Sequence, residues 1–289
     1  MRGVALYIVV ILVAMLQACG TAPKGNGKIL FVSIDPLRFI TQQIAGEEWS
    51  VQTFVPKGSS PETYDPTPSQ LVEVSQSKAF FMAGYLSYEV QWGERLKENA
   101  PNVEFCNTAQ GIDLLTSKHY HGKEEHQGVD PHTWTSPRNM MQIAKNVCLV
   151  LSRIDASNKE QYLQNLDKLN TRLAKVDSTL TEELQNCKQK TFAIYHPSLT
   201  YFANDYGLRQ LCIEDEGKEP SPQQLQQLIE QCRAQGVKTI FIQKEFNVQN
   251  AQVIAQEIGA QLVQIDPLNY DWEEEMLKIA RYLSNETTN

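Results

Sequence analysis

Histidine is the residue type in this chain with the clearest potential for chemistry. The chain has five histidines among 289 residues, and four of them lie between residues 119 and 132: His119, His121, His126 and His132. The fifth, His196, stands alone. Neutral imidazole is the commonest protein ligand for zinc and similar ions, so this clustering indicates metal binding. The alternative is a solvated loop together with one histidine that is satisfied within the core.

Four metal-competent side chains follow predicted strands. They are Glu62 after 51–55, His132 at the end of the loop after 103–106, His196 directly after 191–195 and Asp266 directly after 261–265. Ligands bind outside the carboxyl ends of the strands in open parallel sheets. Because two of the four residues come from each half of the chain, they can converge only in a cleft between two lobes.

The pattern of apolar runs predicts the elements that must position these side chains. Apolar, β-rich runs alternate with helical periodicity at 29–34, 51–55, 79–83 and 103–106, and again at 191–195, 209–213, 238–242 and 261–265. Such alternation favours parallel sheets built from βαβ units. We therefore expect an α/β fold with two lobes, at 29–156 and 190–289, each holding a parallel sheet of about four strands flanked by helices.

The segment 157–189 between the lobes contains no glycine or proline. Its apolar residues recur at three- and four-residue spacings, which predicts a helix: Leu166, Leu169, Leu173, Val176, Leu180 and Leu184. Such a helix would be roughly 45–50 Å long and would join both lobes along their backs. We expect this rigid connector to limit how far the lobes swing. A coiled-coil dimer is the alternative reading of the stripe.

The N-terminal residues predict export. An uncharged apolar run from Val4 to Leu16 follows Arg2, as in a signal peptide, and is too short to span a bilayer. The sequence Leu16-Gln-Ala-Cys19-Gly20 resembles the lipobox of bacterial lipoproteins. This resemblance implies that residues 1–18 are removed and that Cys19 carries lipid, whereas an ordinary signal peptide is the alternative. Residues 19–28 are small and polar, as in a flexible tether. The mature protein is thus expected to face the periplasm or cell surface, anchored to the membrane.

Cysteine content and charge exclude other classes of site and partner. Apart from Cys19, the chain has five cysteines: Cys106, Cys148, Cys187, Cys212 and Cys232. The number is odd, so at least one thiol stays unpaired within the chain. None forms a C-x-x-C pair, which argues against a thiolate zinc site. A formal net charge of -8 without a basic run argues against nucleic acid as a partner.

Several motifs together resemble one family. Thr63-Tyr-Asp-Pro-Thr-Pro-Ser-Gln70, Asp130-Pro-His-Thr-Trp134, Tyr195-His196 and Asp266-Pro-Leu268 occur in the order of the zinc and manganese solute receptors of bacterial ABC transporters. The resemblance covers nearly all of the mature sequence. It implies two lobes with a backbone helix, a metal ion as cargo and an ABC permease as partner, and we expect a monomer. It implies no enzymatic activity.

The resemblance also implies a ligand set, with one departure. His132, His196 and Asp266 match ligands of the family, whereas Glu62 stands where the first ligand is normally histidine. Glu62 either ligates through oxygen or points away and leaves the position to water. Asp130 either orients an imidazole, as a partner behind the ligand, or simply forms an Asp-Pro turn.

The ligand types bear on which ion is bound. Two carboxylates make the set harder, which admits manganese or iron beside zinc. Against this, the resemblance implies that His196 is the zinc-type residue at a position where manganese receptors carry glutamate. Zinc is therefore the predicted ion and manganese the alternative. A zinc hydrolase would need an open water position, and no His-Glu-x-x-His segment is present. A metal-binding surface adhesin or storage lipoprotein on the same fold remains open.

The stretch from Gly111 to Val129 resembles the charged, histidine-rich insertion of many zinc receptors. Its histidines, His119, His121 and His126, either form an accessory site that collects ions or belong to a solvated loop.

Deletion of residues 119–126 should leave high-affinity metal binding intact, because the four predicted main ligands lie outside this segment. Competition titration against a zinc chelator, with the full chain as reference, measures the affinity. Loss of tight binding in the deletion variant would contradict the assignment of the high-affinity site to residues outside this segment.

Overall fold

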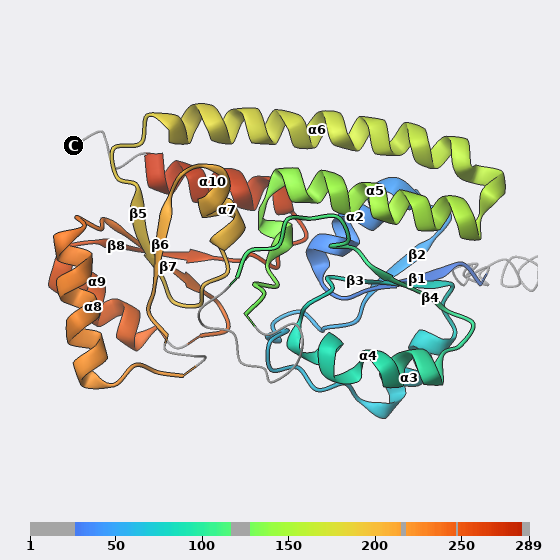
Figure 1. The fold of residues 1–289 in the computed structure, drawn as a ribbon, viewed down its shortest axis with the longest axis horizontal. Helices are drawn as coiled ribbons and strands as arrows, with labels where there is room; N and C mark the ends of the chain where they lie inside the picture. The colour runs from blue at the N-terminus through green and yellow to red at the C-terminus, as the bar shows by residue number, and fades with distance from the viewer. Residues whose placement is uncertain (1–26, 117–127, 215–217, 247, 285–289) are drawn as a thin grey trace, which may run out of the picture.

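Two parallel four-stranded sheets organise the chain. The structure is a computed structural model (Figure 1). It describes residues 27–116, 128–214, 218–246 and 248–284. The first sheet has the order β2-β1-β3-β4. Its strands are β1 (Ile29–Val32), β2 (Ser50–Thr53), β3 (Ala79–Met82) and β4 (Glu104–Asn107). The second sheet has the order β6-β5-β7-β8, with β5 (Thr191–Ile194), β6 (Arg209–Cys212), β7 (Thr239–Gln243) and β8 (Gln261–Ile265). The predicted α/β fold with two lobes is confirmed.

Helices cover both faces of each sheet. In the first lobe, α3 (Pro68–Ser75) and α4 (Ser87–Asn99) lie on one face, and α2 (Asp35–Ala45) and α5 (Pro137–Ile154) on the other (Figure 1). The second lobe adds α7 (Thr200–Asp205), α8 (Pro222–Ala234), α9 (Gln249–Ile258) and α10 (Trp272–Ser284). This covering explains why the inner strands β3 and β7 are buried along their whole length.

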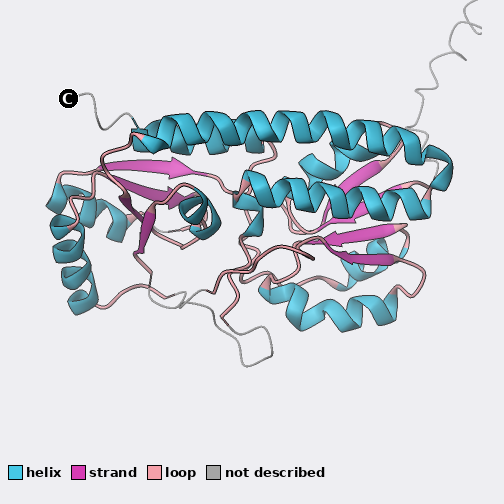
Figure 2. Cartoon of the chain, turned by 45° about the horizontal axis from the view of Figure 1, so that its top comes forward, coloured by secondary structure: helices cyan, strands magenta, loops and turns pink. Residues whose placement is uncertain are grey.

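The long helix α6 (Lys159–Gln185) runs along the backs of both lobes, as Figures 1 and 2 show. It packs against α2 and α5 in the first lobe and against α10 in the second. Its 27 residues correspond to a length of about 40 Å. A short 3-10 turn (Ala156–Asn158) precedes it, so the helix is shorter than the predicted 157–189. Five residues of the predicted stripe are buried within the chain, and Leu166 is partly buried against the same core, so the stripe packs inside the protein and does not support the coiled-coil alternative.

Two buried tryptophans join the lobes near the carboxyl ends of the strands. The indole N–H of Trp134 donates to the carbonyl of Pro267 at 3.0 Å, and that of Trp272 donates to the carbonyl of Trp134 at 2.8 Å. The loop that carries His132 is thereby tied to the loop that carries Asp266. One continuous apolar core contains residues of both lobes and of α6. A wide opening of the lobes would have to break these contacts, which agrees with the expectation of small lobe tilts.

Several sequence predictions concern parts of the chain outside the described residues. The signal peptide 1–18, Cys19 and the accessory histidines His119, His121 and His126 lie there. Within the described ranges, no helix is both long and apolar enough to cross a bilayer. Cys148 and Cys232 are buried with free thiols, so an unpaired cysteine is present, as the odd number predicts. The exact lobe boundaries stay a prediction.

Candidate metal centre

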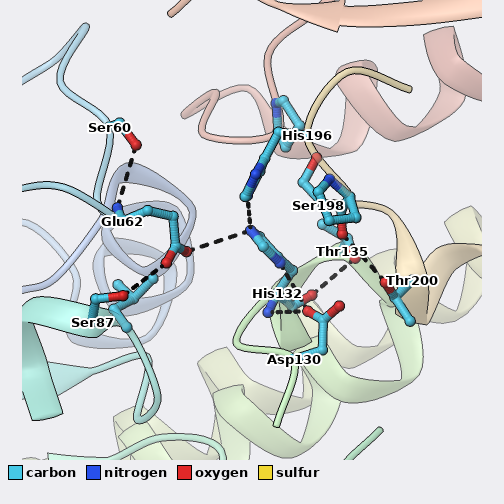
Figure 3. Close-up of polar contacts among 12 residues, drawn as sticks. Ser60, Glu62, Ser87, Asp130, His132, Thr135, His196, Ser198 and Thr200 are labelled. Atoms are coloured by element: carbon cyan, nitrogen blue, oxygen red, sulfur yellow. Dashed lines mark hydrogen bonds and ion pairs between the residues drawn. The ribbon is translucent and has the colours of Figure 1, made fainter. Parts of the chain in front are cut away.

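Three of the four predicted ligands meet between the lobes. Glu62 lies on the loop between β2 and α3, His132 on the loop before α5, and His196 two residues after the end of β5. Each offers one ligand atom, and these atoms lie within 4.8 Å of one another. His132 Nε2 is 3.2 Å from His196 Nε2 and 3.7 Å from Glu62 Oε1 (Figure 3). The structure therefore brings side chains from both lobes to one point.

Asp130 fixes the orientation of His132. Its Oδ1 lies 2.8 Å from His132 Nδ1 and accepts the backbone N–H of His132 at 2.9 Å. The Asp130 carbonyl accepts the hydroxyl of Tyr201 at 2.9 Å, which anchors this loop to the second lobe. Both Asp130 and His132 are buried. With Nδ1 held by a carboxylate, Nε2 faces the other ligands, which is the arrangement of a metal-binding histidine. The orienting role predicted for Asp130 agrees with these contacts.

His196 has an equivalent partner that sequence reasoning missed. Glu214 Oε1 lies 2.9 Å from His196 Nδ1, and Glu214 is only 6% exposed. Glu214 follows β6, which pairs with β5 in parallel. Residues that follow neighbouring parallel strands lie at the same sheet edge, but only the structure shows that β6 lies beside β5, so the sequence pattern did not single out Glu214.

The backbone of His196 is also held by a side chain. Gln243 at the end of β7 accepts the N–H of His196 at 3.3 Å and donates to its carbonyl at 2.7 Å. The ring of Phe246 stacks on the imidazole at a centroid distance of 5.4 Å. These contacts fix the position and the tilt of the His196 ring.

The protonation of His132 follows from its surroundings. Burial alone would lower the pKa of this imidazole, but the negative charges of Asp130, Glu62 and Glu214 outweigh it and raise the pKa above the usual 6.5. Burial likewise acts to raise the pKa of Asp130, but the facing His132 lowers it below the usual 3.8. Carboxylate surroundings thus favour a positive charge at this point.

One carboxylate oxygen of Glu62 lacks a hydrogen-bond partner among the described residues. Its Oε2 accepts a hydrogen bond from the hydroxyl of Ser87 at 3.1 Å. Its Oε1 is buried and has no hydrogen-bond partner among the described residues. A buried carboxylate oxygen without a partner is costly, and a cation beside it would remove this cost. Glu62 points towards the histidines, and the reading in which it points away is not supported.

Asp266, the fourth predicted ligand, does not lie in this group. Its carboxylate forms an ion pair with the ammonium of Lys244 at 2.9 Å, and its backbone N–H donates to Glu275. Asp266 lines an adjacent interlobe cavity of about 150 Å³, which Lys57 and Glu245 also border. The ligand role of Asp266 therefore stays a prediction.

The space beside the three ligands is large enough for an ion. A cavity of about 30 Å³ is lined by Glu62, His132 and His196, with Trp134 and Phe246 on its wall. This volume accommodates an ion with a coordinated water. Two imidazoles with a carboxylate are a donor set for divalent transition metals.

Comparisons with known proteins agree with this site. The family model described as "Zinc-uptake complex component A periplasmic" matches residues 30–289. The chain belongs to this family. Its members are metal-binding substrate-binding proteins of ABC transporters and not enzymes, so the predicted absence of enzymatic activity is confirmed.

Relatives named for zinc and for manganese are both present. The high-affinity zinc uptake system protein ZnuA of Bacillus subtilis is 26% identical over 299 residues, 96% of this chain and 92% of its own. The manganese ABC transporter substrate-binding lipoprotein PsaA of Streptococcus mitis is 27% identical over 269 residues, 87% of this chain and 85% of its own. A crystal structure of ZnuA superimposes with a TM-score of 0.82 at 35% identity and covers 89% of this chain and 98% of that one. Overall identity therefore does not decide the ion.

Metal affinity should fall as the pH decreases through the raised pKa of His132, because the ion must displace a proton from the imidazole. Asp130→Asn removes a charge that raises this pKa, so the loss of affinity should begin at lower pH than in the wild type. Chelator-competition titrations from about pH 5 to 8 measure the profile. Asp167→Asn, on the exposed side of α6, is the matched control. An unchanged profile in Asp130→Asn would contradict the assigned cause.

Proposed function

We propose that the protein is the extracytoplasmic, high-affinity zinc receptor of an ABC transporter. It binds the ion between the lobes and delivers it to the permease. The observation that carries this proposal is the convergence of Glu62, His132 and His196 from both lobes to within 4.8 Å. Packing alone does not account for this convergence, because it leaves the buried Oε1 of Glu62 without a hydrogen-bond partner among the described residues.

Zinc is favoured over manganese by the nitrogen donors. Imidazole suits zinc, whereas carboxylate, carbonyl and water oxygen suit manganese. The two Nε2 atoms are only 3.2 Å apart, and each ring is held through Nδ1 by a buried carboxylate. Such carboxylate partners raise the basicity of the imidazole and fix it as a ligand. The carboxylate of Glu62 keeps manganese as the second candidate.

We further propose that Asp266 becomes the fourth ligand when the ion arrives. In the present arrangement the ammonium of Lys244 neutralises its carboxylate. An ion beside His196 would compete with Lys244 for Asp266, and the Lys244 side chain is 54% exposed, so it can turn towards solvent. Four protein ligands would complete the tetrahedral shell that zinc prefers.

Attachment to the membrane completes the proposal. Relatives such as PsaA are named lipoproteins. We propose that Cys19 carries the lipid anchor, that residues 19–28 act as a tether, and that the receptor is a monomer facing the periplasm or cell surface. The accessory histidines His119, His121 and His126 would collect ions for the main site.

Replacement of His132 or His196 by alanine should weaken zinc binding by more than roughly 100-fold, since even the partners of metal ligands are worth 10- to 100-fold. His119→Ala is the matched control and should bind like the wild type. Elemental analysis of protein purified without added metal, followed by competition of zinc against manganese, identifies the ion. Tight binding in both ligand variants would overturn the site, and a preference for manganese would overturn the choice of ion.

Asp266→Asn should also weaken zinc binding, whereas Lys244→Met should strengthen it by roughly fivefold at most. The limit follows because an ion pair with one exposed partner is worth up to about 1 kcal/mol. Lys57→Met is the control, since Lys57 borders the same cavity and has no ion pair with Asp266 among the described contacts. Wild-type affinity in Asp266→Asn would rule out ligation by Asp266.

A further inference from the structure

We propose that Ser87 restricts Glu62 to ligation through one oxygen and thereby favours zinc over ions that take more ligands. This inference rests on the proposed function, because it concerns the same site. It arises from the position at which the chain departs from the histidine implied by its family resemblance. A carboxylate can offer two oxygens to an ion, whereas an imidazole offers one nitrogen. A further group must therefore hold one of the oxygens if Glu62 is to donate a single atom, as a histidine would.

The two oxygens of Glu62 have different surroundings. Oε2 accepts the hydroxyl of Ser87 at 3.1 Å and lies on the side of α4 (Figure 3). Oε1 is buried without a described partner and lies 3.7 Å from His132 Nε2. An ion held between the two Nε2 atoms would therefore meet Oε1. Chelation by both oxygens would require the carboxylate to rotate until Oε2 also faces the ion, and this rotation would weaken the hydrogen bond from Ser87.

Ser87 is itself held in place by a buried network. It is the first residue of α4, and the carboxylate of Glu89 binds the turn before it. Glu89 accepts the backbone N–H groups of Ala83 at 2.8 Å and Gly84 at 2.6 Å, as well as the hydroxyl of Ser33. Glu89 is 5% exposed, so water does not compete for these bonds.

Glycine is required in this turn. Gly84 has a φ of 111°, and a Cβ there would lie 2.1 Å from Asn107 Oδ1 at the end of β4. The turn therefore sits directly against the first sheet. This close packing fixes the backbone that leads into Ser87, so the Ser87 hydroxyl is held within reach of Glu62.

The other end of Glu62 is restrained as well. The backbone N–H of Glu62 donates to the hydroxyl of Ser60 at 3.3 Å. Ser60 thus contacts the main chain of Glu62, whereas Ser87 contacts its carboxylate (Figure 3). Ser60 thus holds the loop that carries Glu62, and we infer that Ser87 sets how many carboxylate oxygens face the ion.

Coordination number connects this geometry to selectivity. Zinc is mostly four-coordinate with nitrogen, sulfur and single oxygen donors, whereas manganese prefers octahedral sites rich in oxygen. Glu62 held through one oxygen keeps the number of donors low. Glu62 binding through both oxygens would add a donor and shift the preference towards manganese. Ser87 thus makes Glu62 resemble a one-donor histidine.

Ser87→Ala should lower the ratio of zinc to manganese affinity by roughly tenfold, equivalent to about 1.4 kcal/mol, the scale of a hydrogen bond to a charged group. Metal competition titrations measure the ratio. X-ray absorption of the zinc-loaded variant should show an added oxygen donor. Ser87→Thr keeps the hydroxyl and should restore both results, and Ser60→Ala should leave the ratio unchanged.

Introducing Ser87→Ala into a Glu62→His variant distinguishes this role of Ser87 from a general effect on folding. In Glu62→His the ligand has one donor nitrogen, so adding Ser87→Ala should no longer change the ratio. Metal binding by the wild type with an unchanged ratio and oxygen count in Ser87→Ala would overturn this inference and leave the proposed function intact. Absence of metal binding by the wild type would overturn the proposed function itself.

Discussion

The structure depends on two imidazoles that face each other across the lobes, each held from behind by a buried carboxylate. Asp130 holds His132, and Glu214 holds His196, so both Nε2 atoms point to one place 3.2 Å apart. Burying these acids is costly unless they are paired, and the histidines provide that pairing. The free ring nitrogens and Glu62 Oε1 then form an incomplete polar cluster, which a divalent cation would complete.

Such a cluster requires that the two lobes keep a fixed position relative to each other. The helix α6 packs on both lobes. The hydrogen bonds of Trp134 and Trp272 connect the loop that carries His132 to the loop that carries Asp266. A site divided between lobes is exposed to any relative motion, and displacements of a fraction of an ångström change a metal–ligand bond. With such rigidity, release of the ion by the proposed receptor would depend on local movements, such as those of the Lys244 and Asp266 side chains.

Much of this architecture was predictable from the sequence. Glu62 and His132 follow strands of the first sheet and His196 follows a strand of the second. Because residues after parallel strands gather at the carboxyl edge of their sheet, the sequence placed all three at the two edges that face the cleft between the lobes. The stripe from Leu169 to Leu184 predicted the helix between the lobes. In contrast, the pairing of Asp266 with Lys244 depends on the path of the loop after β7, and the role of Glu214 depends on which strand lies beside β5. Neither is encoded in local periodicity. The contact of Ser87 with Glu62 joins the first residue of α4 to a loop 25 residues earlier, and the sequence pattern did not predict it either.

We propose that one ion binds between the lobes on Glu62, His132 and His196. Anomalous X-ray scattering from crystals of the zinc-loaded protein, measured on both sides of the zinc absorption edge, tests it most directly. We expect a single strong peak between the two Nε2 atoms and Glu62 Oε1. A peak at another position, or none at this one, would contradict it.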